Sequence, residues 1–319
     1  MSESALIAEC PLCGSEGRFA YEGSDQLLRR GGTYRYLDCL SCGAVFLSPM
    51  PDAATISTFY PEEYLDHDQP PVAKPLGRVR QAVLTARYGY PLTGVSTMVR
   101  WLGHVVSRFM YRDEIAWRGG GKALDVGCGN GKFVQKLASL GWQSSGVEFS
   151  DSAAQAGRDA GLDIQTGELQ SAAFAAQSFN LVSARHLIEH LPDPRGFMAE
   201  AYRVTAPGGR LVIRTPNSRA LGRGWFGVNW YANDPPRHVV LYSAKNLGQL
   251  AEGAGFSTVF TRTFTSPKII LNSWDYQQGN VGKPSRKKKL WRVLARLYVV
   301  LASVTGRGDE LFAVYEKQQ

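Results

Sequence analysis

The chain has 319 residues, of which 44% are apolar and 20% are charged, and it carries a formal net charge of +8. This composition is that of a globular protein and excludes a chain that stays disordered for lack of apolar residues. The longest apolar runs, such as 297–304, are much shorter than the roughly 20 residues that a membrane-spanning helix needs. The first nine residues contain two acids and no apolar core, unlike a secretory signal. We therefore expect a cytoplasmic protein of about two domains, whose positive charge permits nucleic acid, anionic lipid or phosphorylated partners without choosing among them.

Four of the five cysteines form two C-x-x-C-G repeats, which predict a small zinc ribbon over residues 1–50 with strands near 18–21 and 33–37. Four thiolates would leave no open position for a reactive water, so the metal would be structural. The alternatives are a disulfide pair, which a reducing cytosol disfavours, and a redox C-x-x-C, which would not need duplication. The predicted ligands are Cys10, Cys13, Cys39 and Cys42.

Residues 51–118 are predicted to form a linker and helices. Prolines and aromatic residues at 46–52 and 59–64 suggest an extended segment that packs on a neighbour, followed by a short helix. The run of Pro, Asp and Lys at 66–76 is typical of a linker. Apolar residues then recur at helical spacing over 77–117, with a break near Gly89. We interpret them as helices that cap the following domain; an ordinary packing face is the alternative that we favour.

The central motif is residues 122–133, KALDVGCGNGKF, in which a short apolar strand breaks into a glycine turn and restarts as a helix. Glycines allow a tight turn and a close ligand approach, and the helix presents unpaired N–H groups there. The next strand, 143–147, delivers Glu148 to the position from which a carboxylate binds ribose hydroxyls. The motif predicts a nucleoside-bearing cofactor; the alternative is an ordinary tight turn with a surface Glu.

The acid followed by G-x-G-x-G, from Asp125 to Gly131, resembles motif I of the class I S-adenosylmethionine-dependent methyltransferases. The resemblance implies that the acid helps to hold the cationic methionine end, and that the turn at 167–169 offers an acid and a backbone amide to the adenine. The implied cofactor-binding residues are Asp125, Gly127, Cys128, Gly129, Gly131, Glu148, Phe149, Glu168 and Leu169.

Strands and helices alternate from residue 119 onward. Further strands are predicted at 163–166, 179–184, 211–214, 257–264 and 309–317, and helices at 132–140, 150–160, 195–204 and 244–253. The expected fold is α/β, a Rossmann-like seven-stranded methyltransferase sheet over 119–319 whose last strand is antiparallel and forms the edge. The pattern C-x-x-C-G, P-x-P and Y-P-x-x-Y resembles the zinc-ribbon leader of a bacterial methyltransferase family, so the ribbon would be part of the enzyme.

Residues 217–238 are rich in Gly, Trp and Tyr and are predicted to form an irregular substrate loop after the fifth strand. In zinc-bearing sugar methyltransferases of similar layout, a histidine at the end of this loop is a proposed base. Here His238 is kept, but Arg237 replaces the acid that usually precedes it, which leaves the orientation of the imidazole open.

The decapeptide 185–194 resembles the segment after the fourth strand in small-molecule methyltransferases, which contains Glu-His and a proline-bearing cap. We therefore name His238 first and His186 second as catalytic candidates, because imidazole titrates near neutrality. His190 is a further rival, although a packing or capping role suits it better. Tyr231 and Tyr242 are candidates for orienting the substrate.

The predicted function is methyl transfer from S-adenosylmethionine to a small molecule, such as a nucleotide-linked sugar or another glycan or lipid precursor. Alternatives are a nucleic-acid-binding protein with a vestigial methyltransferase domain, and an RNA or protein methyltransferase. Basic residues are dispersed, no aromatic and basic residues interleave as a stacking platform, and no Asn-Pro-Pro-Tyr or Asp-Pro-Pro-Tyr follows the fourth strand. We expect S-adenosylmethionine and structural Zn²⁺ as cofactors and no nucleic-acid partner; the sequence carries no signal for the oligomeric state.

A helical insertion is expected at 267–308, where the basic cluster 286–289 opens a helix over 290–304. One interpretation is peripheral contact with the inner membrane face through 286–304, with acidic headgroups on the basic cluster and lipid on the apolar face. The alternative, which we favour, is a helix packed on its own domain with a solvated basic start.

Overall fold

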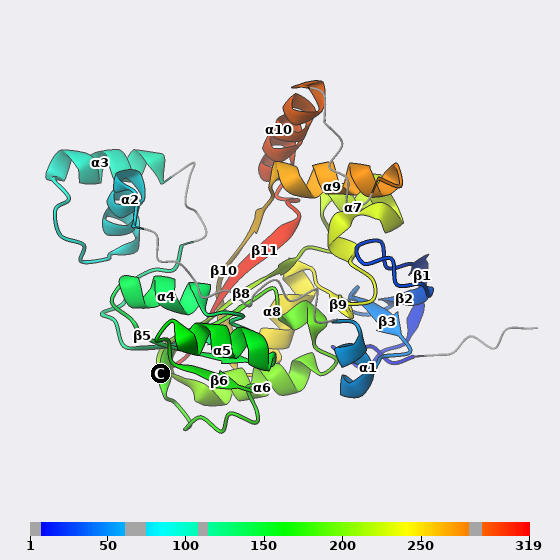
Figure 1. The fold of residues 1–319 in the computed structure, drawn as a ribbon, viewed down its shortest axis with the longest axis horizontal. Coiled ribbons are helices and arrows are strands. Elements are labelled where there is room, and N and C mark those ends of the chain that lie inside the picture. The colour runs from blue at the N-terminus through cyan, green and yellow to red at the C-terminus, as the bar shows by residue number, and fades with distance from the viewer. Residues whose placement is uncertain (1–7, 61–74, 108–113, 281–288) are drawn as a thin grey trace, which may run out of the picture. The chain divides into compact units, whose positions relative to one another are not determined.

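The computed structural model describes residues 8–60, 75–107, 114–280 and 289–319 (Figure 1). Most of the predicted linker at 66–76, and the basic residues 286–288, lie outside the described residues. The chain divides into two compact units, one comprising residues 1–66 and 184–319 and the other residues 67–183. The boundary between the units falls inside the strand β7.

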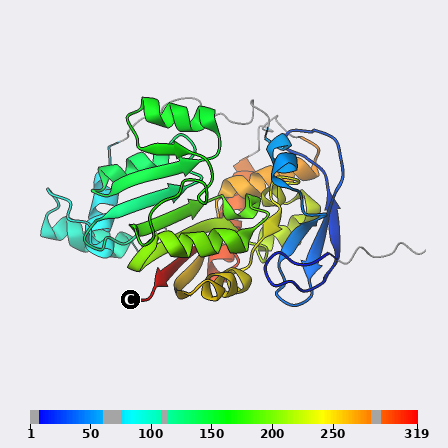
Figure 2. The ribbon, with the colours of Figure 1, turned by 90° about the horizontal axis from the view of Figure 1, so that it is seen from below.

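The predicted seven-stranded α/β sheet is confirmed, with the strand order β10-β11-β8-β7-β4-β5-β6 (Figure 2). β4, β5 and β6 pair in parallel, and β11 is antiparallel to both β8 and β10, as expected for the last strand. The strands are β4 (Lys122–Val126), β5 (Gln143–Glu148), β6 (Ile164–Thr166), β7 (Phe179–Arg185), β8 (Thr205–Pro216), β10 (Phe256–Phe264) and β11 (Glu310–Lys317).

The prediction that the last strand forms the edge of the sheet is wrong. β11 lies between β10 and β8, and its residues 311–315 are buried without a break, whereas β10 is largely half-exposed. A continuous apolar run such as Leu-Phe-Ala-Val-Tyr is typical of a strand covered on both faces and flanked on both sides. The reversed strand is therefore internal, and β10 is the edge.

The described residues of the unit 67–183 contain four helices: α2 (Arg78–Tyr88), α3 (Thr97–Val106), α4 (Lys132–Ser139) and α5 (Asp151–Asp159). α2 ends where predicted, because Gly89 adopts the left-handed conformation with φ of 74°. Buried Glu114 binds Arg80 of α2 and Lys136 of α4 and so ties these helices together. On α3, by contrast, Met98 and Trp101 are exposed, although Gly103 of this helix packs closely against Ala82 of α2.

The helices of the other unit include several inside segments where none was predicted. Residues 217–238 are not irregular throughout, since they contain α7 and two 3₁₀ turns, each too short to produce a periodic sequence pattern. The elements are α1 (Ala53–Thr58), η2 (Ile188–His190), α6 (Pro194–Val204), α7 (Leu221–Phe226), η3 (Gly227–Asn229), η4 (Tyr231–Asn233), α8 (Ala244–Gly253), α9 (Pro267–Gln277) and α10 (Lys289–Val304).

α10 presents two different apolar faces. Ala295, Tyr298 and Ala302 are buried, and α10 packs beside α9 (Figure 1). Leu297 and Val300 lie on another face and are 60% and 61% exposed. The predicted packing of this helix on its own unit therefore accounts for only one face. Within the described residues, every helix is too short or too polar to cross a membrane.

The N-terminal residues form a four-stranded antiparallel sheet in the order β1-β2-β3-β9. Its strands are β1 (Gly17–Gly23), β2 (Tyr34–Cys39), β3 (Val45–Ser48) and β9 (Val240–Leu241). The two predicted strands are present and longer than expected. β9 comes from the segment after the substrate loop and pairs with Val45 and Phe46, so the ribbon shares a sheet with residues almost 200 positions later in the sequence (Figure 2).

Candidate active site and metal centre

The glycine turn follows β4 in the unit of residues 67–183. Gly127, Gly129 and Gly131 all have positive φ, at 68°, 55° and 79°, which an L side chain rarely adopts. At Gly131 a Cβ would also lie 2.6 Å from the Cδ1 atoms of Leu162 and Ile164. The turn therefore requires glycine for both conformation and space, and α4 starts directly from it.

One carboxylate binds the backbone of this turn, and a second is buried at its start. Glu148, at the end of β5, accepts hydrogen bonds from the backbone N–H of Gly129 at 2.7 Å and of Ser150 at 2.9 Å. Asp125 is buried at the end of β4 and accepts a hydrogen bond from the Ser183 hydroxyl at 2.5 Å. Because an ionised carboxylate has about four acceptor positions, Glu148 keeps capacity for a ligand hydroxyl while it holds the turn.

The other predicted cofactor residues lie at the ends of the next two strands. Phe149 is 57% exposed, which leaves its ring face available. The turn after β6 is joined to β5 by a hydrogen bond from the Gly167 N–H to the Glu148 carbonyl oxygen, with Glu168 exposed and Leu169 buried behind it. All nine predicted cofactor-binding residues thus belong to one compact unit and to the carboxyl ends of β4, β5 and β6.

Cys128 differs from the other eight because its side chain belongs to the core. It packs with Val134, Ala154 and Ile164, and burial raises the pKa of its thiol. A Cβ on Gly146 would lie 2.5 Å from its Sγ atom. Cys128 can therefore offer only its backbone to a ligand in the turn.

In the other unit, a cluster of histidines surrounds Glu189, which is fully buried after β7. One carboxylate oxygen accepts a hydrogen bond from the Thr215 hydroxyl at 2.9 Å, and the other lies 3.4 Å from Nδ1 of His186. Burial alone would raise the pKa of Glu189, but His186, His190 and His238 outweigh it and hold the pKa at about 2. Glu189 is thus a permanent negative charge among three imidazoles.

His190 and His238 lie against each other, with ring centroids 4.7 Å apart. Nδ1 of His238 is 2.9 Å from the Ala232 carbonyl oxygen, and Nδ1 of His190 is 2.9 Å from that of Arg237. Since a carbonyl oxygen can only accept, the neutral His238 ring carries its proton on Nδ1 and keeps the lone pair on Nε2. Nδ1 of His190 lies near both this kind of acceptor and the Tyr60 hydroxyl, at 2.6 Å. Burial, and next the charge of His238, lower the pKa of His190 to about 4, so its ring is uncharged at neutral pH.

Comparison with known proteins identifies the domain that contains both groups. Residues 102–260 match a family model described as a methyltransferase domain. The chain therefore carries a methyltransferase domain, as the sequence motifs predicted. It is 31% identical over 121 residues to the ubiquinone biosynthesis O-methyltransferase of Thiobacillus denitrificans, covering 35% of this chain and 52% of that protein. The enzyme of the same name from Cupriavidus pinatubonensis is 26% identical over 171 residues, with 50% and 69% covered.

The chain spans about half the length of most of the curated relatives that it matches, such as 52% and 50% of the first two. Among solved structures, it is similar to a SAM-dependent methyltransferase from Archaeoglobus fulgidus, with a TM-score of 0.46, 19% identity, and coverage of 68% of this chain and 94% of that chain. The cofactor residues and the histidine cluster fall inside the methyltransferase domain, and the four predicted metal ligands fall outside it.

The four predicted metal ligands converge in the ribbon, before the methyltransferase domain. Their sulfur atoms all lie within 4.8 Å of one another, with Cys10 and Cys42 at 3.7 Å and Cys13 and Cys39 at 3.4 Å. These distances are far from the roughly 2.05 Å of a disulfide and near the edge of about 3.8 Å that a tetrahedron of Zn–S bonds requires. Two N–H groups, of Leu12 and Cys42, point at sulfurs at 3.4 Å, as in a thiolate knuckle.

The ribbon supports the histidine cluster of the methyltransferase domain. Arg237, 1% exposed, forms two hydrogen bonds with Asp25 of the ribbon, at 2.9 and 3.0 Å, and also binds Asp234. The hydroxyl of Tyr36 in β2 donates to the His238 carbonyl oxygen at 2.9 Å. Arg237, which stands where the resemblance expects an acid, thus joins the backbone next to His238 to the ribbon.

Tyr242, Tyr231 and His186 lie in three different surroundings. Tyr242 is fully buried, with its hydroxyl bonded to the Ile188 carbonyl oxygen, so it is a core residue and cannot orient a substrate. Tyr231 is half-buried against Tyr276. His186 is 46% exposed between Glu189 and Glu310; partial burial favours its neutral form, but these carboxylates raise its pKa. His186 thus lies between two carboxylates, whereas Nδ1 of His190 and of His238 lies beside a backbone carbonyl oxygen.

Sequence reasoning missed Glu189, Tyr60 and Asp25. Glu189 stood in the recognised Glu-His pair, and its burial could have been suspected from the apolar residues around it. The Tyr60 hydroxyl lies 2.6 Å from Nδ1 of His190 and comes from the N-terminal part of the chain. Neither its pairing nor that of Asp25 leaves a local signal, because each joins residues more than 100 positions apart.

Proposed function

We propose that the protein transfers a methyl group from S-adenosylmethionine to a small-molecule acceptor. The observation that carries the proposal is the glycine turn of the methyltransferase domain, whose Gly129 N–H is bound by the Glu148 carboxylate. An acid at the end of the second strand beside a glycine turn is the arrangement that binds a ribose at the carboxyl ends of a doubly wound sheet.

The residues present fit this cofactor. Positive φ at three glycines opens the turn to a close ligand, buried Asp125 offers a charge to a cationic methionine end, and exposed Phe149 offers a face for an adenine ring. When bound, the cofactor supplies an electrophilic methyl group on its sulfonium. The chain must then bind, align and desolvate the reactants.

An acceptor hydroxyl or acidic carbon also needs a base, and we assign this role to His238. Its Nδ1–H is held by the Ala232 carbonyl oxygen, so that Nε2 is the atom that would accept the acceptor's proton. Burial lowers the pKa of His190 to about 4, so this ring is a weaker base than an ordinary imidazole, although it is unprotonated at neutral pH. Glu189 would stabilise the imidazolium that forms at either ring.

The acceptor class rests on less direct support. The relatives named ubiquinone biosynthesis O-methyltransferases favour a hydroxyl acceptor. The resemblance of the sequence to zinc-bearing sugar methyltransferases favours a nucleotide-linked sugar or a lipid-linked precursor. Within the ribbon, we assign a structural Zn²⁺ to Cys10, Cys13, Cys39 and Cys42, where four sulfurs would leave no open coordination position.

Calorimetric titration of the full chain with S-adenosylhomocysteine tests the cofactor assignment, and micromolar binding is the expected result. His238→Ala should bind the same ligand within about twofold of the wild type and lose at least about a hundredfold in turnover, which is the lower end of general-base effects. The control is His104→Ala, an exposed histidine on α3. Absent binding to a folded, zinc-loaded protein rejects the function, and a fully active His238→Ala rejects only the base.

We also propose that α10 contacts an anionic membrane surface. Its outward face exposes Leu297, Val300 and Val304, at 60%, 61% and 81%, and the sequence places basic residues at 286–289 directly before it. Vesicles rich in phosphatidylserine should co-sediment the wild type at low salt, and Leu297→Glu with Val300→Glu should stay in the supernatant. Equal sedimentation of both would reject the contact.

A further inference from the structure

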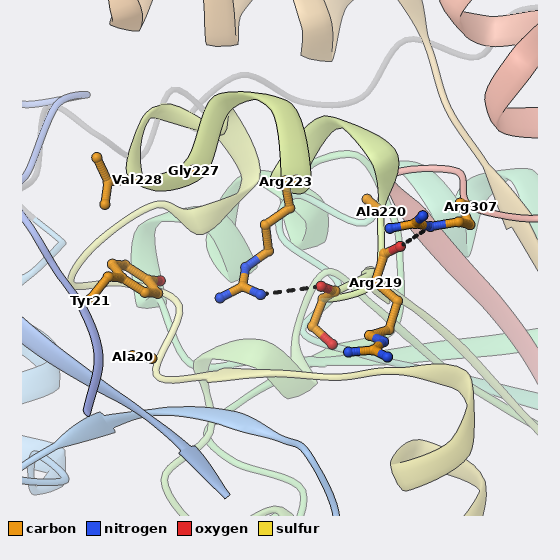
Figure 3. Close-up of a pocket in the computed structure, with 10 residues that line it drawn as sticks. Ala20, Tyr21, Arg219, Ala220, Arg223, Gly227, Val228 and Arg307 are labelled. Atoms are coloured by element: carbon orange, nitrogen blue, oxygen red, sulfur yellow. Dashed lines mark hydrogen bonds between the residues drawn. The ribbon is translucent and has the colours of Figure 1, made fainter. Parts of the chain in front are cut away.

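A cavity of about 350 Å³ lies between the ribbon strand β1 and the substrate loop (Figure 3). β1 supplies Ala20 and Tyr21, and the loop supplies residues 218–220, 223, 224, 227 and 228. Arg307, which follows α10, completes the lining. The cavity begins immediately after the carboxyl end of β8, so it opens where substrates of doubly wound sheets bind.

Three residues that line the cavity each carry a buried polar atom without a hydrogen-bond partner in the described residues. These atoms are the Tyr21 hydroxyl, Oγ of Ser218 and Nε of Arg223. Buried polar groups are rarely left unpaired in folded proteins, because each costs about 1–3 kcal/mol. All three atoms belong to residues that line one cavity, so a polar ligand bound there would satisfy them once these side chains turn toward it.

The charge of the walls indicates the sign of that ligand. Arg219, Arg223 and Arg307 line the cavity, and Figure 3 shows the Arg223 guanidinium reaching into the space between Tyr21 and Arg219. A smaller adjoining cavity shares Arg219 and Arg223 and adds Arg18 with a single acid, Asp38. The described linings therefore hold four arginines against one carboxylate.

The arginines are held in place by neutral groups. Arg223 donates to the Ser218 carbonyl oxygen at 3.3 Å, and its Cζ lies 5.6 Å from the centre of the Tyr21 ring; Arg307 donates to the Arg219 carbonyl oxygen at 3.1 Å. Their charges are thus positioned but not neutralised by these contacts. Guanidinium groups bind phosphate through parallel N–H donors, which suits such an arrangement.

We propose that this cavity is a subsite for a phosphate or diphosphate group of the methyl acceptor. That the ligand is the methyl acceptor rests on the proposed function. The binding of an anion in this cavity does not depend on that function. It favours a phosphorylated or nucleotide-linked acceptor over an uncharged one. The ribbon has a direct role in this subsite, because β1 forms one wall and Cys39, a metal ligand, lines the adjoining cavity.

The test is calorimetric titration of the full, zinc-loaded chain with inorganic pyrophosphate and with uridine diphosphate in about 50 mM salt. The decisive variants are Arg223→Gln, which removes one positioned charge, and Ser218→Ala, which removes an unpaired hydroxyl. Because that hydroxyl has no partner, Ser218→Ala should leave the melting temperature unchanged or slightly higher. The control is Arg203→Gln, which removes the same charge from an exposed ion pair with Glu200 on α6.

We expect the wild type and Arg203→Gln to bind both anions, Arg223→Gln to bind at least tenfold more weakly, and Ser218→Ala about threefold to tenfold more weakly. The proposal is overturned if the wild type binds neither anion at millimolar concentration. It is also overturned if Arg223→Gln and Ser218→Ala bind like the wild type. A parallel titration with S-adenosylhomocysteine distinguishes the proposed function from the anion subsite. Absent binding of S-adenosylhomocysteine rejects the methyltransferase function and leaves the result for the anions unchanged.

Discussion

The two candidate sites of the methyltransferase domain are built in opposite ways. The cofactor turn draws its residues from 125–169, a single stretch of strands and helices in sequence order. The histidine cluster draws on Tyr60, on residues 186–190 after β7, and on residues 232–238 of the substrate loop. The first is local and follows from a motif, whereas the second depends on pairings between distant segments and on the ribbon that fixes them.

This contrast predicts that a substitution in the ribbon will impair the histidine cluster and leave the cofactor turn intact. Cys39→Ser should remove the bound metal, of which the wild type should hold about one zinc per chain, because a fragment with so little core depends on its metal for folding. Turnover should fall by at least a hundredfold, while affinity for S-adenosylhomocysteine changes by less than about threefold. Elemental analysis and calorimetry measure the two effects.

Cys128→Ser is the matched control, because it alters the only cysteine outside the ribbon and should keep the zinc. A metal-free, folded wild type would contradict the ribbon assignment. A second zinc that survives Cys39→Ser would instead show that Glu189, His190 and His238, whose ligand atoms also lie within 4.8 Å of one another, bind a metal.

The buried ion pair between the ribbon and the loop gives the next largest effect. Arg237→Met leaves Asp25, 6% exposed, buried without its guanidinium, and should cost about 3–5 kcal/mol of unfolding free energy in urea. The Arg237 guanidinium outweighs burial and lowers the pKa of Asp25, which agrees with a strong pairing.

Arg203→Met breaks an exposed pair and should cost less than about 1 kcal/mol. The double variant Asp25→Leu with Arg237→Met should recover part of the loss, since no buried charge is then left alone. If Arg237→Met were as stable as Arg203→Met, the ribbon would not be anchored through this pair.

A substitution at the cofactor turn should weaken cofactor binding and leave the stability of the fold nearly unchanged. Glu148→Gln keeps one oxygen that can accept from Gly129 or Ser150, so the fold should persist. It loses the charge that strengthens a hydrogen bond to a ribose hydroxyl, and affinity for S-adenosylhomocysteine should fall about tenfold or more. Glu168→Gln, at an exposed turn, should have a smaller effect, and unchanged affinity in Glu148→Gln would refute the placement of the site.

The sequence predicted the parts of the molecule whose signals are local. The glycine turn, the carboxylate after β5, the knuckle cysteines and the alternation of strands and helices each occupy a few adjacent residues. It did not predict that β3 would pair with β9, that Asp25 would bind Arg237, or that β11 would lie inside the sheet. These outcomes depend on which distant segments meet, and nothing in a local pattern specifies that choice.

The smallest predicted effect is an acid sensitivity specific to the histidine cluster. The folded-state pKa of His190 is about 4, below its ordinary 6.5, so between these values the unfolded chain binds more protons and stability declines as pH falls. Glu189, with a pKa of about 2, keeps its contribution above pH 4.5 and loses it only in stronger acid. The loss of stability between pH 6.5 and pH 4.5 therefore measures the protonation of His190. The groups that face this imidazole are Tyr60, Glu189, Asp234, the Arg237 carbonyl oxygen and His238.

Between pH 7 and pH 5, His190→Gln should lose less unfolding free energy than the wild type, by about 1–2 kcal/mol. Urea denaturation at the two pH values measures the difference. His104→Gln, an exposed histidine of α3, should follow the wild type. If His190→Gln showed the full wild-type loss, the imidazole would be accessible to protons in the folded state, and the cluster would be as open to solvent as the cofactor turn.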